Sequence, residues 1–385
     1  MRLKLVLAAS LLAVGTAAAN ETSKRFLGDV ALLLSLQDAT AAGHLNAVDL
    51  QRQLLGQISM TYAGEAGKFE PVTMNVSAVV SYVLGGGNPD FAEAFSKVDG
   101  LADADRKLLA GSAHFMRGQR AEAIKDLSGI DPLKLPGEIG GRVALIEAMS
   151  LADTEPRKLE LLSIAVAAMP GTLVEESALR RSAATAAAAG LPDVFCRWTS
   201  RYLRRFPKSL YAAEFARTLA GHVVNLERAG HHVDLALLDA ALSSLPQGRR
   251  MTVYLQMART ATAASLLPLA QYAARRTLRL SANGSFEELT ATLHNALPDI
   301  AGPDYDLALA RLRGIDAGRL EQHDRLLLHA ALAVADRIRQ PGAGVEAGGS
   351  SLNDAAPQPP EQERLAKRAA MALANADATL ETITQ

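Results

Sequence analysis

Short apolar runs with a spacing of three or four residues, each stopped by Gly or Pro, constrain the fold of this chain most strongly. Residues 108–116 show this spacing, Gly118 interrupts it, and residues 121–127 resume it. The pattern predicts a helix, a turn and a second helix. No Asn-Gly or Asp-Gly pair separates two alternating apolar runs, so the sequence contains no good β-hairpin signal. We therefore expect an all-α protein.

Composition and length narrow the architecture. The chain has 385 residues, of which 49% are hydrophobic and only 4% are aromatic. The apolar content is carried by Ala and Leu, which favour helices over strands. A single hydrophobic core rarely grows beyond about 250 to 300 residues. The length therefore calls for several domains or for a quasi-linear helical array.

A weak internal repeat favours the array. Pro170-Gly171 and Phe206-Pro207 each precede a predicted helix, and Gly190-Leu191-Pro192 breaks the chain between them. Units of helix, turn and helix that repeat every 34 to 40 residues or so are typical of tetratricopeptide-like solenoids. We predict such a helical-hairpin solenoid over residues 20–339. An array of this kind leaves long faces free for proteins or peptides.

The first residues resemble an export signal. Arg2 and Lys4 precede an apolar run over 5–15, and Ala17-Ala18-Ala19 offers small residues for cleavage. This predicts a secretory signal peptide over 1–19, cut after Ala19. The alternative is an uncleaved anchor helix, but the run is shorter than the ~20 residues that a membrane span needs. We expect a soluble mature chain in the periplasm, without a membrane span.

The last part of the chain differs from the array. Residues 340–361 are rich in Pro, Gly and Ser, which predicts a disordered linker. Residues 362–385 predict an amphipathic helix, with Leu365, Leu373 and Leu380 on one side. That helix either docks back on the solenoid or binds a partner.

The sequence gives little sign of catalysis or of cofactor binding. The 40 basic and 41 acidic residues nearly balance, so no field attracts nucleic acid. One cysteine cannot form an internal disulfide or a thiolate cluster, and none of the eight histidines lies in an HExxH motif. Cys196 lies in the aromatic stripe of residues 195–206, where it is better explained as a small buried hydrophobe. We therefore expect no enzyme, no cofactor and no metal site.

Arginine pairs supply the candidate partner surface. Arg180-Arg181, Arg204-Arg205, Arg249-Arg250 and Arg275-Arg276 punctuate the predicted helices. If the repeat aligns some of them, they form a basic stripe for an acidic or polar partner; otherwise they are solvated and pair with nearby acids. The partner-binding candidates belong to the helix that starts at Thr172 and to the next one. They are Thr172, Glu175, Glu176, Arg180, Arg181, Arg204 and Arg205.

Three residue pairs have the spacing of a capping box, in which the first side chain bonds the third amide and an acid bonds back. The pairs are Asp90 with Glu93, Thr172 with Glu175, and Ser285 with Glu288. Each therefore predicts the start of a helix.

Several segments together resemble a known family. They are Leu34-Ser35-Leu36-Gln37-Asp38, Gly43-His44, Gln51 to Leu55, Gly86 to Pro89, the longest match from Pro170 to Arg181, and Arg201 to Phe206 followed by Ser209, Tyr211 and Phe215. They resemble the MotC family of periplasmic motility proteins from rhizobia and related α-proteobacteria. None of these segments is a catalytic motif.

The resemblance implies a non-enzymatic accessory of the flagellar motor. Proteins of that family are associated with the periplasmic part of the stator protein MotB, are needed for flagellar rotation, and have a dedicated chaperone, MotE. The helical organisation by itself equally fits a generic periplasmic tetratricopeptide-like scaffold for envelope or peptidoglycan machinery. A third alternative is the superhelical part of a lytic transglycosylase, but no segment of the sequence has the size and turn pattern of an appended catalytic domain.

Overall fold

The computed structural model describes residues 21–339. The signal peptide expected over 1–19, the linker over 340–361 and the helix over 362–385 lie outside them. The described residues form seventeen α-helices and no strand, which confirms the all-α prediction. No helix of this part is long and apolar enough to cross a membrane. One compact unit extends to Asp336, and a second begins at Arg337, inside the last described helix.

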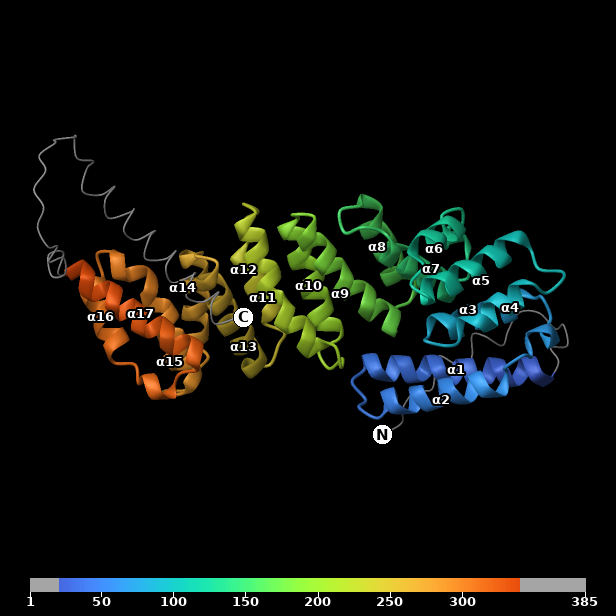
Figure 1. Ribbon diagram of the computed structural model, residues 1–385, viewed down its shortest axis with the longest axis horizontal. Coiled ribbons are helices and arrows are strands. Elements are labelled where there is room, and N and C mark those ends of the chain that lie inside the picture. Colours follow the sequence, from blue (N-terminus) through green and yellow to red (C-terminus); the bar gives the residue numbers. More distant parts are fainter. Residues whose placement is uncertain (1–20, 340–385) are drawn as a thin grey trace, which may run out of the picture. The chain divides into compact units, whose positions relative to one another are not determined.

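Seven α-helices and two 3-10 turns open the compact unit (Figure 1). They are α1 Glu21–Ala41, α2 Ala47–Thr61, η2 Ala66–Lys68, α3 Thr73–Leu84, α4 Pro89–Ser96, α5 Asp103–Met116, α6 Arg120–Leu127, η3 Pro132–Lys134 and α7 Gly137–Ser150. The boundary between α5 and α6 confirms the predicted turn at Gly118. These helices enclose an aromatic cluster, in which four rings lie with their centroids within 5.8 Å of that of Phe26. Edge-to-face pairs of this kind add to the burial energy.

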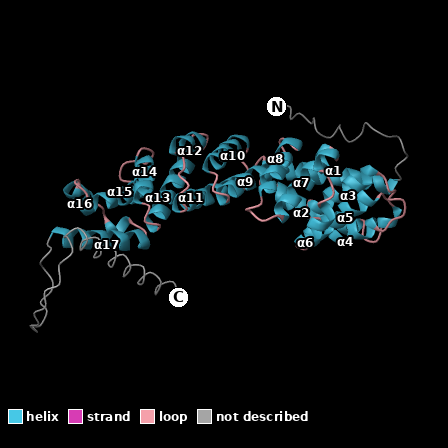
Figure 2. Cartoon of the chain, turned by 90° about the horizontal axis from the view of Figure 1, so that it is seen from above, coloured by secondary structure: helices cyan, strands magenta, loops and turns pink. Residues whose placement is uncertain are grey.

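Eight further α-helices continue the unit. They are α8 Pro156–Ala168, α9 Leu173–Ala188, α10 Pro192–Arg205, α11 Ala212–Arg228, α12 Leu235–Leu242, α13 Gln247–Ala263, α14 Leu267–Leu278 and α15 Phe286–Ala296. Most of them pack on their neighbours in the chain, whereas α11 packs on α9 and α13, and α12 packs on α10. Figure 2 shows α8, α10 and α12 along one side and α9, α11 and α13 along the other. This succession of hairpins is the organisation of a helical array.

The described chain ends with two more α-helices and two 3-10 turns: η4 Leu297–Ala301, α16 Tyr305–Arg313, η5 Ala317–Arg319 and α17 Gln322–Arg339. Asp324, in the first turn of α17, is 1% exposed and faces Arg259 at 2.5 Å and His294 at 3.5 Å. Burial by itself raises the pKa of Asp324, but the nearby His294 and Arg259 lower it overall. The carboxylate therefore stabilises the docking of α17 on α13 and α15.

Within the described residues, the hydrophobic core consists of three buried clusters. The first is formed by α1 to α7, the second mostly by α7 to α15, and the third by α15 to α17 with the turns between them. Because each cluster is filled by helices that are close in sequence, the length of the chain never requires one oversized core.

Two of the three predicted capping boxes are confirmed. The Oγ1 of Thr172 accepts from the amide of Glu175 at 3.3 Å, and the Oγ of Ser285 accepts from the amide of Glu288 at 3.2 Å. The two glutamates bond back to the amides of Gly171 and Gly284, one residue before the expected position. The boxes therefore mark the starts of α9 and α15.

The prediction that Asp90 caps a helix is wrong. The cap of α4 is Asn88, whose Oδ1 accepts from the amide of Asp90 at 2.9 Å. Pro89 occupies the first helical position, where its missing N–H costs nothing and its fixed φ suits the helix. Asp90 and Glu93 instead pair with Arg117, the residue that follows α5, at 2.6 and 2.7 Å.

The aromatic stripe of α10 is buried as predicted. Phe195, Thr199 and Tyr202 are fully buried, and Phe206 is nearly so. Cys196 is 2% exposed, and burial raises the pKa of its thiol to about 12. A thiol that stays protonated at neutral pH is a poor nucleophile, which supports the core interpretation.

Candidate interaction surface

The first turn of α9 is tied to the last turn of α10 by a buried carboxylate. Glu175 is 1% exposed, and its oxygens accept from the Nε and an Nη of Arg205 at 3.0 and 2.6 Å. Arg201 approaches the same carboxylate to 3.8 Å. These hydrogen bonds raise the pKa of Arg205. The acid at a helix start and the base at a helix end also complement the two helix dipoles.

Glu176 joins three segments at once. Its side chain is fully buried and accepts from the hydroxyls of Tyr202 and Ser209, at 2.8 and 3.0 Å, and from the Nε of Arg180 at 3.2 Å. Burial and the neighbouring carboxylate raise the pKa of Tyr202. A buried charge is tolerated only where hydrogen bonds replace its water. Glu176 therefore fixes α9, α10 and the turn before α11 in one arrangement.

The last turn of α1 reaches the same place. Asp38 accepts from the amide of Leu173 at 3.0 Å, and so caps α9 from a position 135 residues earlier in the chain. Burial raises the pKa of Asp38, while this bond and the charge of Arg142 oppose the rise. Arg142 on α7 is itself buried, which lowers its pKa, and its Nε has no hydrogen-bond partner within residues 21–339. The two opposite charges compensate one another at this junction.

Gly43 brings the turn between α1 and α2 against the turn after α10. Its φ is +93°, a conformation that glycine adopts readily. A Cβ at this position would lie 2.2 Å from the carbonyl oxygen of Lys208. Only glycine fits this close approach. We call the meeting point of α1, α9, α10 and the Lys208 turn the α1–α9–α10 junction.

The structure gives most of the candidate residues partners inside the protein. Thr172 caps α9, and Glu175 and Glu176 are buried. Arg180 pairs with Glu176, and its side chain is 26% exposed. Arg181 donates to the hydroxyl of Ser177 at 3.3 Å, and burial lowers its pKa.

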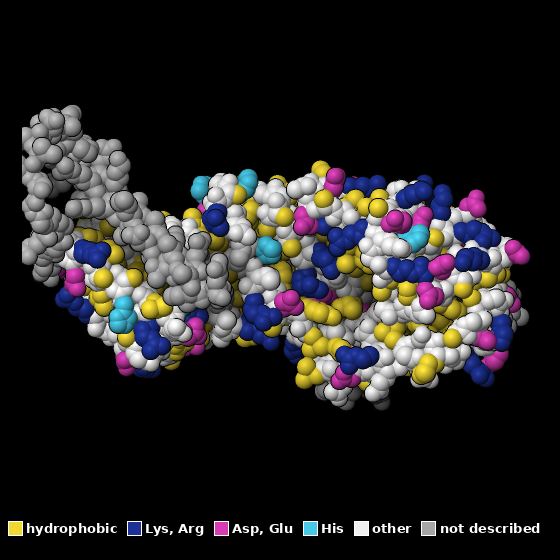
Figure 3. Space-filling view, viewed as in Figure 1, with side chains coloured by type: hydrophobic (Ala, Val, Ile, Leu, Met, Phe, Trp, Pro, Cys, Tyr) yellow, Lys and Arg dark blue, Asp and Glu magenta, His cyan; other side chains and the backbone are white. Residues whose placement is uncertain are grey.

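Two of the candidates remain accessible at the end of α10. The side chain of Arg205 is 46% exposed beside Glu175. Arg204 is exposed and forms no ion pair or hydrogen bond with any described residue. On the face shown in Figure 3, Lys and Arg side chains gather over α9 and α10 beside hydrophobic ones.

Three arginines of the later pairs also contact neighbouring helices or turns. Arg249 donates to the carbonyl of Pro207 at 3.1 Å, Arg275 donates to Asn295 at 3.2 Å, and Arg276 pairs with Asp239. These contacts hold successive hairpins together.

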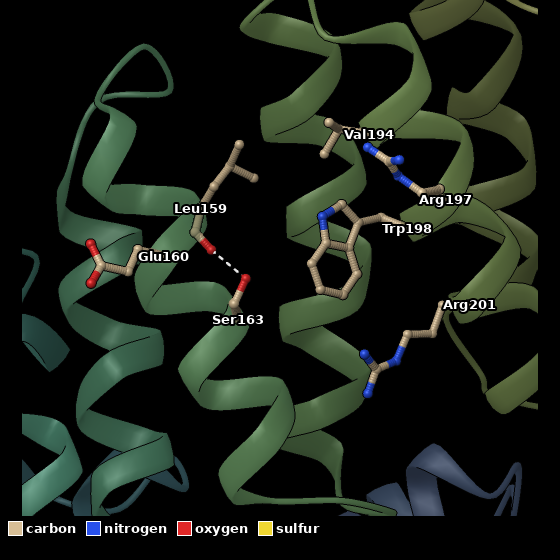
Figure 4. Close-up of a pocket in the computed structure, with 7 residues that line it drawn as sticks. All are labelled: Leu159, Glu160, Ser163, Val194, Arg197, Trp198 and Arg201. Carbon is tan, nitrogen blue, oxygen red and sulfur yellow. Dashed lines mark hydrogen bonds between the residues drawn. The ribbon is translucent and has the colours of Figure 1, made fainter.

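A groove between α8 and α10 is a feature that the sequence pattern did not reveal. Helices α8, α10 and α12 lie along one side of the array. Of these, α10 and α12 pack on one another, but α8 and α10 are separated by a cavity of about 480 Å³. Its lining residues come from both helices: Leu159, Glu160 and Ser163 from α8, and Val194, Arg197, Trp198 and Arg201 from α10. The indole of Trp198 extends from α10 into the space that faces α8 (Figure 4).

One signal for the groove was present in the sequence. The only tryptophan of the chain lies one residue away from the stripe position Thr199, between Arg197 and Arg201. A large aromatic side chain at the edge of a buried stripe, with a cation on either side, is typical of a surface that remains available to a partner.

Comparison with known proteins now places the chain in a family. A family profile described as Chemotaxis protein MotC matches residues 1–385. The chain belongs to the MotC family. A curated relative, Chemotaxis protein MotC of Rhizobium meliloti (strain 1021), is 31% identical over 357 residues, which cover 89% of this chain and 80% of that protein. No solved structure matches.

Most of the segments that carry the MotC resemblance meet at the α1–α9–α10 junction. Asp38 contacts the start of the 170–181 segment, Gly43 contacts Lys208, and the side chains of residues 201–206 pair with those of 175 and 176. The Nε2 of Gln37 donates to the carbonyl of Gly85 at 3.1 Å, next to the 86–89 segment. In this MotC-family chain, these segments therefore assemble the structural joint between the opening helices and the array.

Proposed function

We propose that this MotC-family chain is a non-enzymatic periplasmic accessory of the flagellar motor. It binds the periplasmic part of the stator protein MotB and is required for flagellar rotation. The match of a MotC profile to the whole chain carries the proposal. A helical array that presents long faces suits a protein that acts by binding other proteins.

The end of α10 is the proposed contact with MotB. Arg204 has no partner in the described part of the chain, and Arg201 and Arg205 are about half exposed. Arginine is enriched where protein surfaces bind one another, because its guanidinium offers several donors in a rigid plane. The buried carboxylate of Glu175 holds Arg205 in place and lies near Arg201.

Deletion of the gene tests the role in rotation. We expect impaired swimming in soft agar while filaments still assemble, since the motor and not the filament loses a component. Normal swimming would refute the proposal. Restoration of swimming by a plasmid copy controls for effects on neighbouring genes.

Direct binding tests the contact. The purified chain without residues 1–19 should capture the purified periplasmic part of MotB, and Arg204→Glu should weaken capture. Arg217→Glu is the matched control, because Arg217 is exposed on α11 and has no partner among the described residues. Arg180 is unsuitable, since its replacement would disturb buried Glu176. Capture of cell-wall enzymes without MotB would favour the generic scaffold.

Export and chaperoning are separate parts of the proposal. Fractionation should find the chain in the periplasm, and its mature N-terminus should follow Ala19. Loss of MotE should lower the level of the chain. A cytoplasmic chain with an intact N-terminus would contradict the export proposal.

A further inference from the structure

The groove between α8 and α10 is the surface outside the junction with the strongest features of a binding site. Its apolar wall consists of Leu159, Val194 and Trp198, which are partly buried and pack on the second core cluster at their inner sides. Their outer sides face the groove. Contact between a partner's apolar side chain and this wall would remove apolar surface from water on both sides, which favours binding.

The rims of the groove carry opposite charges. On α10, Arg197 and Arg201 lie four residues apart and so share one face, with the Trp198 indole beside them. Arg197 is exposed and has no ion pair or hydrogen bond with the described residues. On α8, Glu160 is exposed and likewise lacks such a partner within residues 21–339. The basic rim is the longer one, because Arg204 and Arg205 continue it by one turn.

We propose that this groove binds an amphipathic helical segment of a partner protein, with a leucine-type row against Trp198 and acidic residues facing α10. One helical turn advances about 5 to 6 Å. Carboxylates one turn apart on the partner therefore match the spacing of Arg197 and Arg201 on α10. Glu160 on the opposite rim disfavours acidic residues on the other side of the row and so fixes the orientation of the segment. The proposal holds for any such partner and does not depend on MotB.

Trp198 makes the proposal directly measurable, because it is the only tryptophan of the chain. The probe is a synthetic helical peptide without Trp or Tyr, with leucines at every third or fourth position and glutamates along one flank. A second peptide replaces the glutamates by lysines, and a third replaces the leucines by alanines. We expect a saturable shift of the Trp198 emission with the first peptide and at least tenfold weaker binding of the other two.

Variants locate the binding. Arg197→Glu should weaken binding of the acidic peptide at least tenfold, since it reverses the charge of this rim position. For the same reason, the lysine peptide should bind this variant with nearly the affinity that the acidic peptide has for the unaltered chain. Arg217→Glu on α11 is the matched control and should change neither affinity. Ser163→Arg should block the groove, because Ser163 is exposed and its hydroxyl bonds only to the carbonyl of Leu159 among the described residues. Unchanged far-UV circular dichroism would show that these variants fold.

Three results would overturn the proposal. The first is equal binding of the acidic and lysine peptides, and the second is an equal effect of Arg197→Glu and Arg217→Glu. The third is self-association of the chain that Ser163→Arg abolishes in analytical ultracentrifugation, because the groove would then belong to a second copy. Loss of MotB capture with peptide binding intact would contradict the proposed function and leave the groove proposal standing.

Discussion

Replacing Glu176 by alanine should destabilise the centre of the array more than any surface change. The substitution removes an acceptor of three hydrogen bonds and leaves the hydroxyl of fully buried Tyr202 without its partner. Hydrogen bonds to charged groups contribute about 1.5 to 3 kcal/mol each. The bond from Arg180 counts for little, because that side chain is 26% exposed and regains water. The lost bonds from Tyr202 and Ser209 therefore lower the free energy of unfolding by about 3 to 6 kcal/mol.

The measurement is urea unfolding, followed by circular dichroism and by Trp198 emission, together with amide hydrogen exchange of α9 to α11. Exchange matters because an array of hairpins opens locally and does not unfold in one step. Glu214→Ala is the control, since Glu214 is exposed on α11 and such changes stay within about 0.5 kcal/mol. Tyr202→Phe should lower the free energy of unfolding by about 1.5 to 3 kcal/mol, because it removes one of these bonds and leaves Glu176 two donors. If Glu176→Ala and Glu214→Ala behave alike, the carboxylate does not hold these helices together.

Three further predictions concern the joints of the chain. Gly43→Ala should lower the free energy of unfolding by about 2 to 4 kcal/mol, because residue 43 has a positive φ and a Cβ there would clash with Lys208. Gly56→Ala is the control: this glycine lies in the interior of α2 with open space around it, so the substitution should raise the free energy of unfolding by about 0.5 to 1 kcal/mol in the same urea titration. Asp38→Ala should lower the free energy of unfolding by about 2 to 3 kcal/mol and speed hydrogen exchange at the start of α9, since it removes a cap and the stronger of the two carboxylate charges that compensate buried Arg142; unchanged exchange would argue against the cap. The lowered pKa of Asp324 implies stability that is present above its ordinary pKa, near 4, and is lost as the pH falls through the lower folded value. Asp324→Asn should therefore melt at a lower temperature than the unaltered chain at pH 7, and the difference should shrink as the pH falls below about 4. A difference that stays the same over this range would contradict the assignment.

Local features could be predicted from the sequence. The turn at Gly118, the caps Thr172 and Ser285, and the buried stripe with Cys196 depend on residues a few positions apart, and the structure confirms them. The wrong prediction at Asp90 has a local cause too, because Pro89 moved the helix start forward and made Asn88 the cap.

Contacts between distant residues could not be predicted in this way. Spacing alone does not show that Asp38 would reach Leu173, or that Glu175 would be buried against Arg205. The acid-rich start of α9 therefore looked like a partner surface, although its carboxylates point into the protein. A groove such as that at Trp198 depends on the distance between two helices that are not consecutive in the chain. The spacing of apolar residues along the sequence does not give this distance.

The bond between Asp38 and the amide of Leu173 also has a consequence for the order of folding. Synthesis delivers α1 first, yet the amide that it caps follows 135 residues later. Local hairpins can form as they appear, but this joint has to wait for the first turn of α9. During that interval the carboxylate of Asp38 and the Gly43 turn have no docking site. We expect a chain interrupted before residue 173 to form the first core cluster while the last turn of α1 and the Gly43 turn stay exposed. The completed α9 then covers Asp38, and the turn after α10 covers Gly43.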